Sequence, residues 1–226
     1  MSIRPLLAAT ALLAALPAAA ETREDEQVWL NATVTGPVAG NIIYFAEVQP
    51  RFADGVSRLG QLILRPAIGV KLAPNLTVYQ GYAHVVLPVE NGRDRNEERS
   101  FQQVSWTIAK GRRGELSSRT RMEQRWLSTG GDTGWRLREM IRAETPLGRD
   151  SRSIAALGWV EGFFALNDTD WGAKKGFDQI RGFAGLEIPL KGASTIEAGY
   201  LNQTVNAAGN RTNINHVASL TLFVRY

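Results

Sequence analysis

Charged and apolar residues alternate along the segment from Glu115 to Thr145, where the alternation is the most regular in the chain. A period of two is typical of a β-strand with one charged face and one apolar face. The glycine-containing turn at 128–134 divides the segment into two such strands, so we predict a β-hairpin. Its charged face comprises Arg119, Arg121, Glu123, Arg125, Arg136, Arg138, Arg142 and Glu144.

A less regular alternation predicts nine further strands, separated by turns rich in Gly, Pro, Asn and Asp. They are expected at 27–35, 42–52, 59–72, 76–87, 97–110, 152–166, 177–190, 195–205 and 214–226. Pro66 is unfavourable for a central strand of an ordinary sheet. With the hairpin there are eleven candidates, whereas a single-chain bacterial barrel has an even number of strands. We therefore expect ten strands if 27–35 lies outside the wall, or twelve, slightly favoured, if one strand is missed.

The last predicted strand favours a transmembrane barrel over a water-soluble sandwich. Counting back from the end of the chain, every second residue is apolar and the final residue, Tyr226, is aromatic. This resembles the carboxy-terminal assembly signal of bacterial outer-membrane barrels, and an aromatic residue suits the interfacial girdle of such a barrel. In this arrangement the apolar faces contact lipid and the charges line the lumen.

The lengths of the connectors support the same fold class, an all-β, antiparallel up-and-down transmembrane barrel of ten to twelve strands. Longer connectors alternate with shorter ones, as in bacterial barrels with long outer loops and tight periplasmic turns. The longer set lies near Asp54, Gly92, Gly130, Asp170 and Gly209, and the shorter set near Pro37, Pro74, Arg112, Pro146 and Gly192. This alternation predicts a periplasmic carboxy terminus.

The first twenty residues predict a secretory signal peptide rather than part of the fold. Arg4 precedes the apolar run 5–16, and small residues at 18–20 form a cleavage site before Glu21. The run is too short for a membrane-spanning helix. We expect a barrel domain at 21–226 in the outer membrane of a Gram-negative bacterium. Its expected partners are outer-membrane lipid and the barrel-assembly machinery, the latter through the strand that ends at Tyr226.

Composition excludes several other classes. The chain has no Cys, so no disulfides form, and its formal net charge of +4 is too small to indicate nucleic-acid binding. Arg strongly outnumbers Lys in the sequence. The planar guanidinium fork of Arg suits carboxylate and phosphate groups, because it can donate two parallel hydrogen bonds.

The Arg/Glu array is the main candidate site and has two interpretations. One is a lumen filled with ion pairs that make a small barrel rigid. The other is a narrow, porin-like channel or a binding site for small acidic solutes such as acidic sugars, phosphates or fatty acids. The candidate residues are Arg119, Arg121, Glu123, Arg125, Arg136, Arg138, Arg142, Glu144, Glu161, Arg181 and Glu187.

An enzyme is not expected, although a lipid-modifying barrel enzyme is the alternative from another class. Catalysis would require a nucleophile, a base and an orienting group in contact. The chain has only His84 and His216, and spacing pairs neither with a serine. The carboxylates of 167–170 do not make a complete metal-ligand set, so no metal or cofactor is expected. A soluble periplasmic β-barrel binding protein is a further alternative.

Six short motifs are spread over almost all of the chain after the signal peptide. They are Glu98-Arg99 with Gln102-Gln103, Arg119-x-Arg121-x-Glu123-Gln124-Arg125, Arg136-x-Arg138, Glu161-x-Phe163-Phe164-x-Leu166-Asn167, Phe177-Asp178-Gln179-x-Arg181 and Glu197-x-Gly199-Tyr200. Together they resemble the bacterial domain-of-unknown-function family numbered 2490, and the block at 119–125 is the most specific of them. The resemblance implies a predicted outer-membrane β-barrel without an assigned activity, and it therefore adds no catalytic residue.

Overall fold

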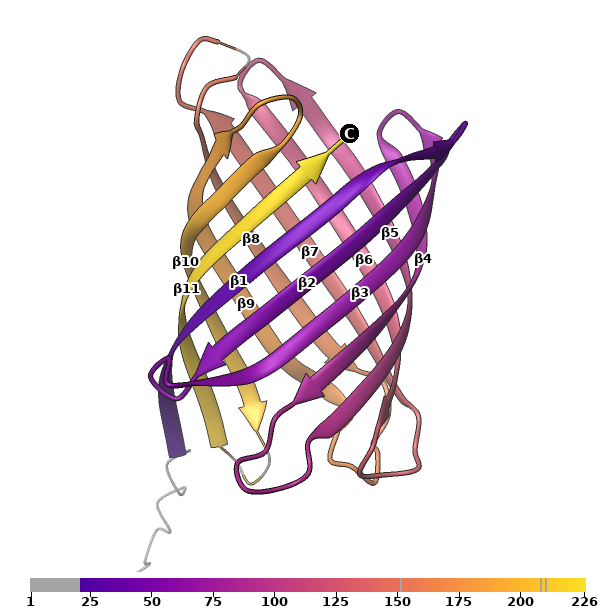
Figure 1. The fold of residues 1–226 in the computed structure, drawn as a ribbon, viewed down its shortest axis with the longest axis vertical. Helices are drawn as coiled ribbons and strands as arrows, with labels where there is room; N and C mark the ends of the chain where they lie inside the picture. Colours follow the sequence, from indigo (N-terminus) through magenta and orange to yellow (C-terminus); the bar gives the residue numbers. More distant parts are fainter. Residues whose placement is uncertain (1–20, 151, 208, 210) are drawn as a thin grey trace, which may run out of the picture.

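The computed structural model describes residues 21–150, 152–207, 209 and 211–226, and the predicted signal peptide lies outside them. The described residues form eleven strands and a closed barrel (Figure 1). No helix within this part of the chain is long and apolar enough to cross a membrane. The strands are β1 (Glu21–Ala39), β2 (Ile42–Ala53), β3 (Arg58–Ala73), β4 (Leu76–Leu87), β5 (Arg95–Gly111), β6 (Gly114–Leu127), β7 (Gly134–Pro146), β8 (Ala155–Ala165), β9 (Gly176–Pro189), β10 (Thr195–Ala207) and β11 (Arg211–Arg225).

The predicted all-β barrel is confirmed, and all eleven candidate segments are strands of its wall. The expectation of an even number was wrong. Consecutive strands pair antiparallel, but β1 and β11 pair parallel, with Glu21 opposite Arg211 and Thr35 opposite Arg225. This parallel pairing satisfies the backbone groups of both edge strands, so closure does not require an even count.

Because β1 and β11 run parallel, the start of β1 and the end of β11 lie at opposite ends of the barrel. One end of the barrel, the loop end, carries the connectors 54–57, 88–94, 128–133 and 166–175 and residue 209 between β10 and β11. The other, the turn end, carries 40–41, 74–75, 112–113 and 190–194, and residues 147–150 and 152–154 between β7 and β8. β1 begins at the loop end, whereas β11 and the carboxy terminus end at the turn end (Figure 1). The predicted alternation of connector lengths holds only in part, because the turn-end connectors after β7 and β9 are longer than the loop-end connectors after β2 and β10.

Pro66 is accommodated because of its place in the ladder. It pairs with Ala46 of β2, but the pairing of β3 with β4 passes from Leu64 to Ala67 and omits Arg65 and Pro66. Proline has no N–H to donate. The gap in the pairing of β3 with β4 is therefore at the residue that could not donate a backbone hydrogen bond.

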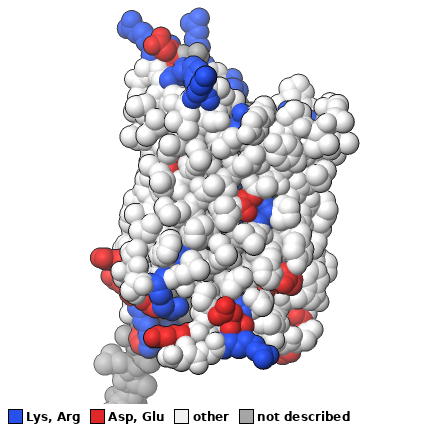
Figure 2. All heavy atoms as spheres, viewed as in Figure 1, with Lys and Arg blue, Asp and Glu red and all other residues white. Residues whose placement is uncertain are grey.

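The alternation divides each strand between an inner and an outer face. The inner face includes an apolar cluster in which the rings of Trp159 and Phe183 stack, with centroids 5.4 Å apart. The other members of this cluster are Trp29, Leu157, Leu201 and Val217. The outer face is mainly apolar, and Figure 2 shows a broad band with few charged side chains between two charged ends. The interior is therefore a packed core of apolar and charged side chains.

Two aromatic rings inside the barrel pack directly against the backbone of the wall at glycine positions. A Cβ on Gly81 would lie 2.1 Å from a ring carbon of Phe101, and a Cβ on Gly199 would lie 2.3 Å from the carbonyl oxygen of Ala184 and 2.8 Å from the ring of Phe183. Any side chain at these positions would displace the ring or the neighbouring strand. The two rings fill the space that these glycines leave.

Candidate functional site

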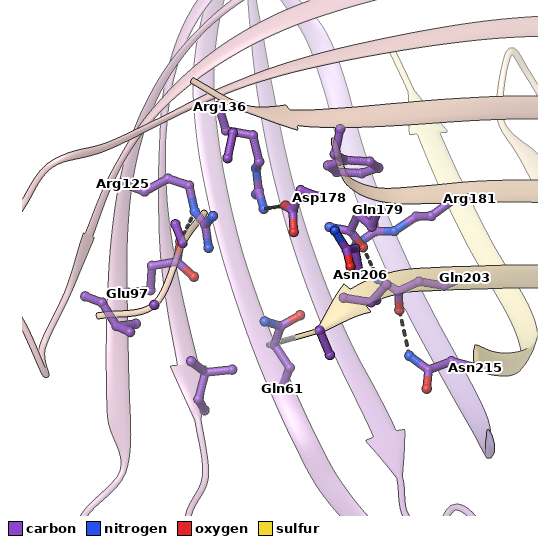
Figure 3. Close-up of a pocket in the computed structure, with 18 of the residues that line it drawn as sticks. Gln61, Glu97, Arg125, Arg136, Asp178, Gln179, Arg181, Gln203, Asn206 and Asn215 are labelled. Atoms are coloured by element: carbon purple, nitrogen blue, oxygen red, sulfur yellow. Dashed lines mark hydrogen bonds and ion pairs between the residues drawn. The ribbon is translucent and has the colours of Figure 1, made fainter. Parts of the chain in front are cut away.

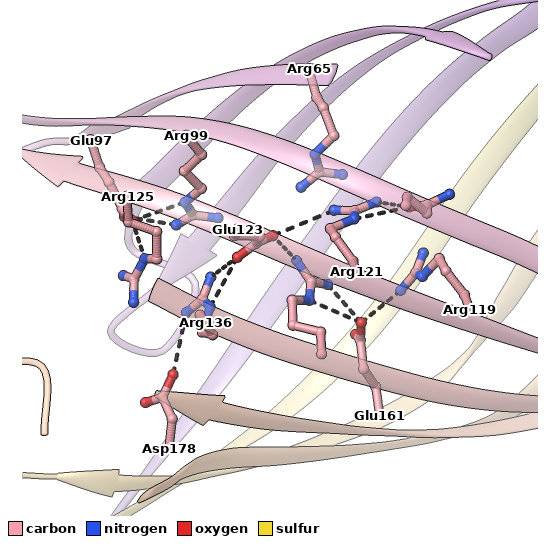
Figure 4. Close-up of polar contacts among 12 residues, drawn as sticks. Arg65, Glu97, Arg99, Arg119, Arg121, Glu123, Arg125, Arg136, Glu161 and Asp178 are labelled. Carbon is pink, nitrogen blue, oxygen red and sulfur yellow. Dashed lines mark hydrogen bonds and ion pairs between the residues drawn. The ribbon is translucent and has the colours of Figure 1, made fainter. Parts of the chain in front are cut away.

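The middle of the barrel holds a buried ion-pair network centred on Glu123, which is 1% exposed. One carboxylate oxygen, Oε2, accepts hydrogen bonds from Nε and Nη2 of Arg136 at 2.9 and 2.6 Å. The other, Oε1, accepts from Nη1 of Arg138 at 2.6 Å (Figure 4). Two guanidinium groups from β7 thus share one carboxylate from β6, with the charge-assisted hydrogen bonds that are the strongest in proteins.

Glu161, on β8, extends this network across the lumen. Its Oε1 accepts from Nε and Nη2 of Arg138 at 3.0 and 2.8 Å, and from Nη2 of Arg119 at 2.8 Å. Arg138 therefore bridges Glu123 and Glu161. Arg119 reaches over β7 from β6, so the contacts connect strands that are not paired in the sheet.

Arg121 also belongs to the network, but its nearest carboxylate oxygen is 3.6 Å away. Its Nε donates to Oε1 of Gln103 at 2.9 Å, its guanidinium lies 4.4 Å from the ring centre of Phe101, and Nη1 is 3.6 Å from Glu123. Nη1 has no hydrogen-bond partner among the described residues. Together with Phe101 and Phe163, which are 2% and 0% exposed, these groups fill the middle of the lumen.

Two smaller groups lie on either side of the network. Toward the loop end, Glu97 accepts from Nε and Nη2 of Arg99 at 3.0 and 2.7 Å, and from Arg125. Toward the turn end, Arg142 is surrounded by three carboxylates, with Glu144 at 2.8 Å, Glu187 at 3.0 Å and Glu197 also in contact. The group around Arg142 thus has three carboxylates and one arginine, whereas the group around Glu97 has two arginines and one carboxylate.

A pocket of about 800 Å³ lies between the network and the loop end (Figure 3). Connector residues 171–175 and 209 contribute to its lining, which also includes amide side chains such as Gln61, Gln203 and Asn215. The acidic side chains of the lining are Glu97 and Asp178. The basic ones are Arg51, Arg58, Arg65, Arg99, Arg125, Arg136, Arg138, Lys174, Lys175 and Arg181. The pocket is thus strongly positive, a property that attracts anions.

Two of these arginines have no ion pair with any described residue. Arg51 donates to the amide oxygens of Gln61 at 2.9 Å and Gln49 at 2.7 Å, and its guanidinium lies 3.7 Å from the ring centre of Trp29. Arg181 donates to Gln179 at 3.4 Å and lies 5.1 Å from the same Trp29 ring. A charge in a lumen without a counter-ion is costly. An anion between the two arginines would relieve this cost.

The sequence-predicted candidates all lie on the inner face but do not form one array. The structure places them in three regions. Arg119, Arg121, Glu123, Arg136, Arg138 and Glu161 form the middle network; Arg125 and Arg181 line the pocket, as do Arg136 and Arg138; Arg142, Glu144 and Glu187 lie toward the turn end. Anion binding by these residues stays a prediction.

Most of the pocket lining was not among the sequence candidates, for example Trp29, Arg51, Arg65, Glu97 and Arg99. Alternation in each strand is the signal that places them on the polar or inner face. No sequence spacing shows that β1 and β2 face β9 across the lumen, because closure of the barrel by β1 and β11 produces that proximity.

The loops beside the pocket are held together by reciprocal hydrogen bonds. The carboxylate of Asp170 accepts from the backbone N–H groups of Gly131 at 2.8 Å and Asp132 at 3.2 Å, and Asp132 accepts from the N–H of Asp170 at 2.8 Å. Trp171 Nε1 donates to the carbonyl oxygen of Asp132 at 2.8 Å. These contacts place Trp171 in the pocket lining. Among the described residues, no cluster of acidic or His side chains could hold a metal ion.

Replacing Asp170 by Ala is expected to increase trypsin cleavage after Lys174 and Lys175, because the loop 166–175 loses its tie to 128–133. The N–H groups of Gly131 and Asp132 lower the pKa of Asp170. The tie is therefore present at neutral pH and is lost only as the pH falls below about 4, through the lowered pKa. Timed digestion of the folded protein followed by mass spectrometry measures the rate. Replacing Glu90 by Ala in another loop is the control, and equal rates in both variants would contradict the proposed tie.

Both histidines lie on the outer face, away from the pocket. Nδ1 of His84 is 2.8 Å from the carboxylate of Glu98, and Nδ1 of His216 is 2.6 Å from the hydroxyl of Tyr200. No serine hydroxyl is hydrogen-bonded to either ring among the described residues. Neither histidine can act on a solute in the lumen.

Comparison with known proteins gives a family but no activity. Residues 26–215 match the family described as "Protein of unknown function (DUF2490)". An uncharacterized protein of Methylorubrum extorquens is 50% identical over 224 residues, which are 99% of this chain and 98% of that protein. No solved structure matches the chain at a significant level. The similarity therefore extends over the whole barrel.

Proposed function

The chain belongs to the DUF2490 family, and from this premise we propose that it is a bacterial outer-membrane barrel that binds a small acidic solute in its loop-end pocket. The observation that carries the proposal is the pair Arg51 and Arg181, which lie against one tryptophan ring without a carboxylate partner. A guanidinium has five N–H donors, so each arginine keeps donors for a carboxylate or phosphate beside its bonds to amides, and Nε of Arg51 has no partner among the described residues.

The outer face supports a membrane location. The strands have 11 to 19 residues, enough to cross a bilayer when tilted. The face is largely apolar, with a band that carries few charges (Figure 2). Five aromatic side chains that are 40% to 47% exposed lie toward the ends of this band, as in the girdles of outer-membrane barrels, whereas Tyr82, 45% exposed, lies near the middle of β4. The five are Trp126, Trp135, Phe164 and Phe177 toward the loop end and Trp106 toward the turn end.

The packing of the lumen favours a binding protein over a channel. Phe163, which lines the pocket, and Phe101, Glu123 and Glu161 of the middle of the lumen are at most 2% exposed. An open pore would leave such side chains in contact with water. The pocket therefore ends at the ion-pair network, and a solute that enters from the loop end is held rather than passed on.

The amide and aromatic side chains of the pocket indicate which class of acidic solute fits it best. A pocket of this volume is in the usual range for small ligands. Arginine side chains recognise an acidic group, the Trp171 ring offers an apolar surface, and the surrounding amides can bond hydroxyl groups. These features suit an acidic sugar or a sugar phosphate better than a fatty acid, which has no hydroxyl groups for the amides.

The proposal is tested on the full-length chain expressed in a Gram-negative host. We expect it in the outer-membrane fraction, with a gel mobility that changes on boiling. In detergent, glucuronate and glucose 6-phosphate should raise the unfolding temperature, whereas glucose should not, and calorimetry should give a single site. Recovery in the soluble periplasm would contradict the membrane location. Equal effects of acidic and neutral sugars, or none, would contradict the anion site.

A further inference from the structure

The outer face of β4 to β7 carries a continuous row of polar side chains inside the apolar band. Gln80, Gln102 and Gln124 form an amide ladder across β4, β5 and β6. The amide of Gln102 donates to Gln80 at 2.9 Å, and the amide of Gln124 donates to Gln102 at 3.0 Å. On the same strands, toward the two ends, lie the exposed rings of Trp106 and Trp126. The ladder is therefore between the aromatic positions and not at the rim.

Two outward carboxylates flank the amide ladder. Glu139, near the middle of β7, accepts hydrogen bonds from the hydroxyls of Ser118 and Thr120. Glu98, on β5, accepts from Tyr82 and contacts His84. A carboxyl group and three amides facing hydrocarbon would be costly, and lipid tails can make no hydrogen bond with them. Such groups mark a surface that another protein covers.

The surface next to the amide ladder is also hollowed. A concavity of about 620 Å³ lies over β3 to β7, with Gln80 and Gln102 on its lining and Val78, Val104, Met122 and Leu137 around them. A concave patch with an apolar rim and a central polar group is suited to close packing against a protein side chain.

We propose that this face is where a second copy of the chain binds in the membrane, giving a two-fold symmetric dimer. Each glutamine amide has two N–H donors and two acceptor lone pairs, and the ladder uses only part of them. An amide ladder is therefore complementary to itself. The central outer faces of β1 to β3, β8 and β9 are mainly apolar, as at Leu64 and Val160, and on β10 and β11 the outward Tyr200 and His216 are hydrogen-bonded to each other. A second copy can satisfy the ladder with its own ladder, in an isologous interface. This inference rests on the membrane location proposed above.

The test uses the absence of cysteine from the chain. Gln80→Cys, Gln102→Cys and Gln124→Cys are made singly, and isolated outer membranes are treated with a short bis-maleimide. We expect a product of twice the chain mass for at least one of them. The control is Leu220→Cys, 45% exposed on β11, on the wall opposite β5, which should give no product. Equal product from the control, or products only with a different protein, would overturn the dimer.

A second variant separates the dimer from the fold. The triple substitution Q80L/Q102L/Q124L makes the patch apolar, so it should abolish dimers measured by light scattering in mild detergent and leave the heat-induced gel shift intact. A wild-type chain that is monomeric there and gives no cross-link at any ladder position would overturn the inference. Absence from the outer-membrane fraction would overturn the membrane location instead, and a folded monomer in that fraction would refute the dimer alone.

Discussion

Replacing Glu123 by Gln is expected to destabilise the folded barrel by roughly 3 kcal/mol, because it leaves the Arg136 and Arg138 guanidinium groups with too little buried counter-charge. Arg138 keeps Glu161, and Arg136 keeps only the longer contact to Asp178 at 3.3 Å. Glutamine can still accept one hydrogen bond, so the loss stays at the lower end for a broken buried pair. The measurement is urea unfolding in detergent, followed by tryptophan fluorescence.

Glu115→Gln is the matched control for Glu123→Gln, because it removes the same charge from a pair at the turn end. Glu115 contacts Lys110, whose side chain is 75% exposed, and such surface pairs contribute at most about 1 kcal/mol. Adding Arg136→Met to Glu123→Gln should recover part of the lost stability, since the orphaned cation is removed. Equal midpoints for Glu123→Gln and Glu115→Gln would show that the network does not hold the barrel together.

Replacing Arg51 or Arg181 by Gln is expected to weaken binding of the acidic solute roughly tenfold to a hundredfold, while the fold is retained. A hydrogen bond to a charged group contributes about 1.5–3 kcal/mol, which corresponds to this range of dissociation constants. Neither residue is ion-paired with a described carboxylate, so no buried acid loses its partner. Calorimetry with glucuronate measures the affinity, and urea unfolding measures the stability.

Arg58→Gln is the control for the two pocket variants. Arg58 also lines the pocket but is 43% exposed and paired with Asp54. Its loss should change the affinity less than threefold, since the pair is at the solvated rim. If Arg51→Gln and Arg181→Gln bind as tightly as Arg58→Gln, the solute does not lie between Arg51 and Arg181, and the proposed site is wrong.

The sequence by itself determined the fold class and the two faces of each strand. Alternation at 119–125 and 136–144 follows directly from the two-residue period of a strand, so Arg121, Glu123 and Arg138 could be placed on one face before any contact was known. Turn residues located all eleven strands, because Gly, Pro and Asn interrupt the ladder locally. These are properties of the chain over a few residues.

Only the tertiary structure decided the number of strands, the pairing of charges and the position of the pocket. Eleven strands close because β1 and β11 pair parallel, a contact between residues almost 200 positions apart. That closure places Arg51 and Arg181 on the same tryptophan ring, while Glu123 and Glu161 pair with Arg136 and Arg138 in the middle network. Local patterning tells which face a charge occupies. Which charges meet across a lumen depends on strand order, register and closure, and these are set by contacts between distant segments.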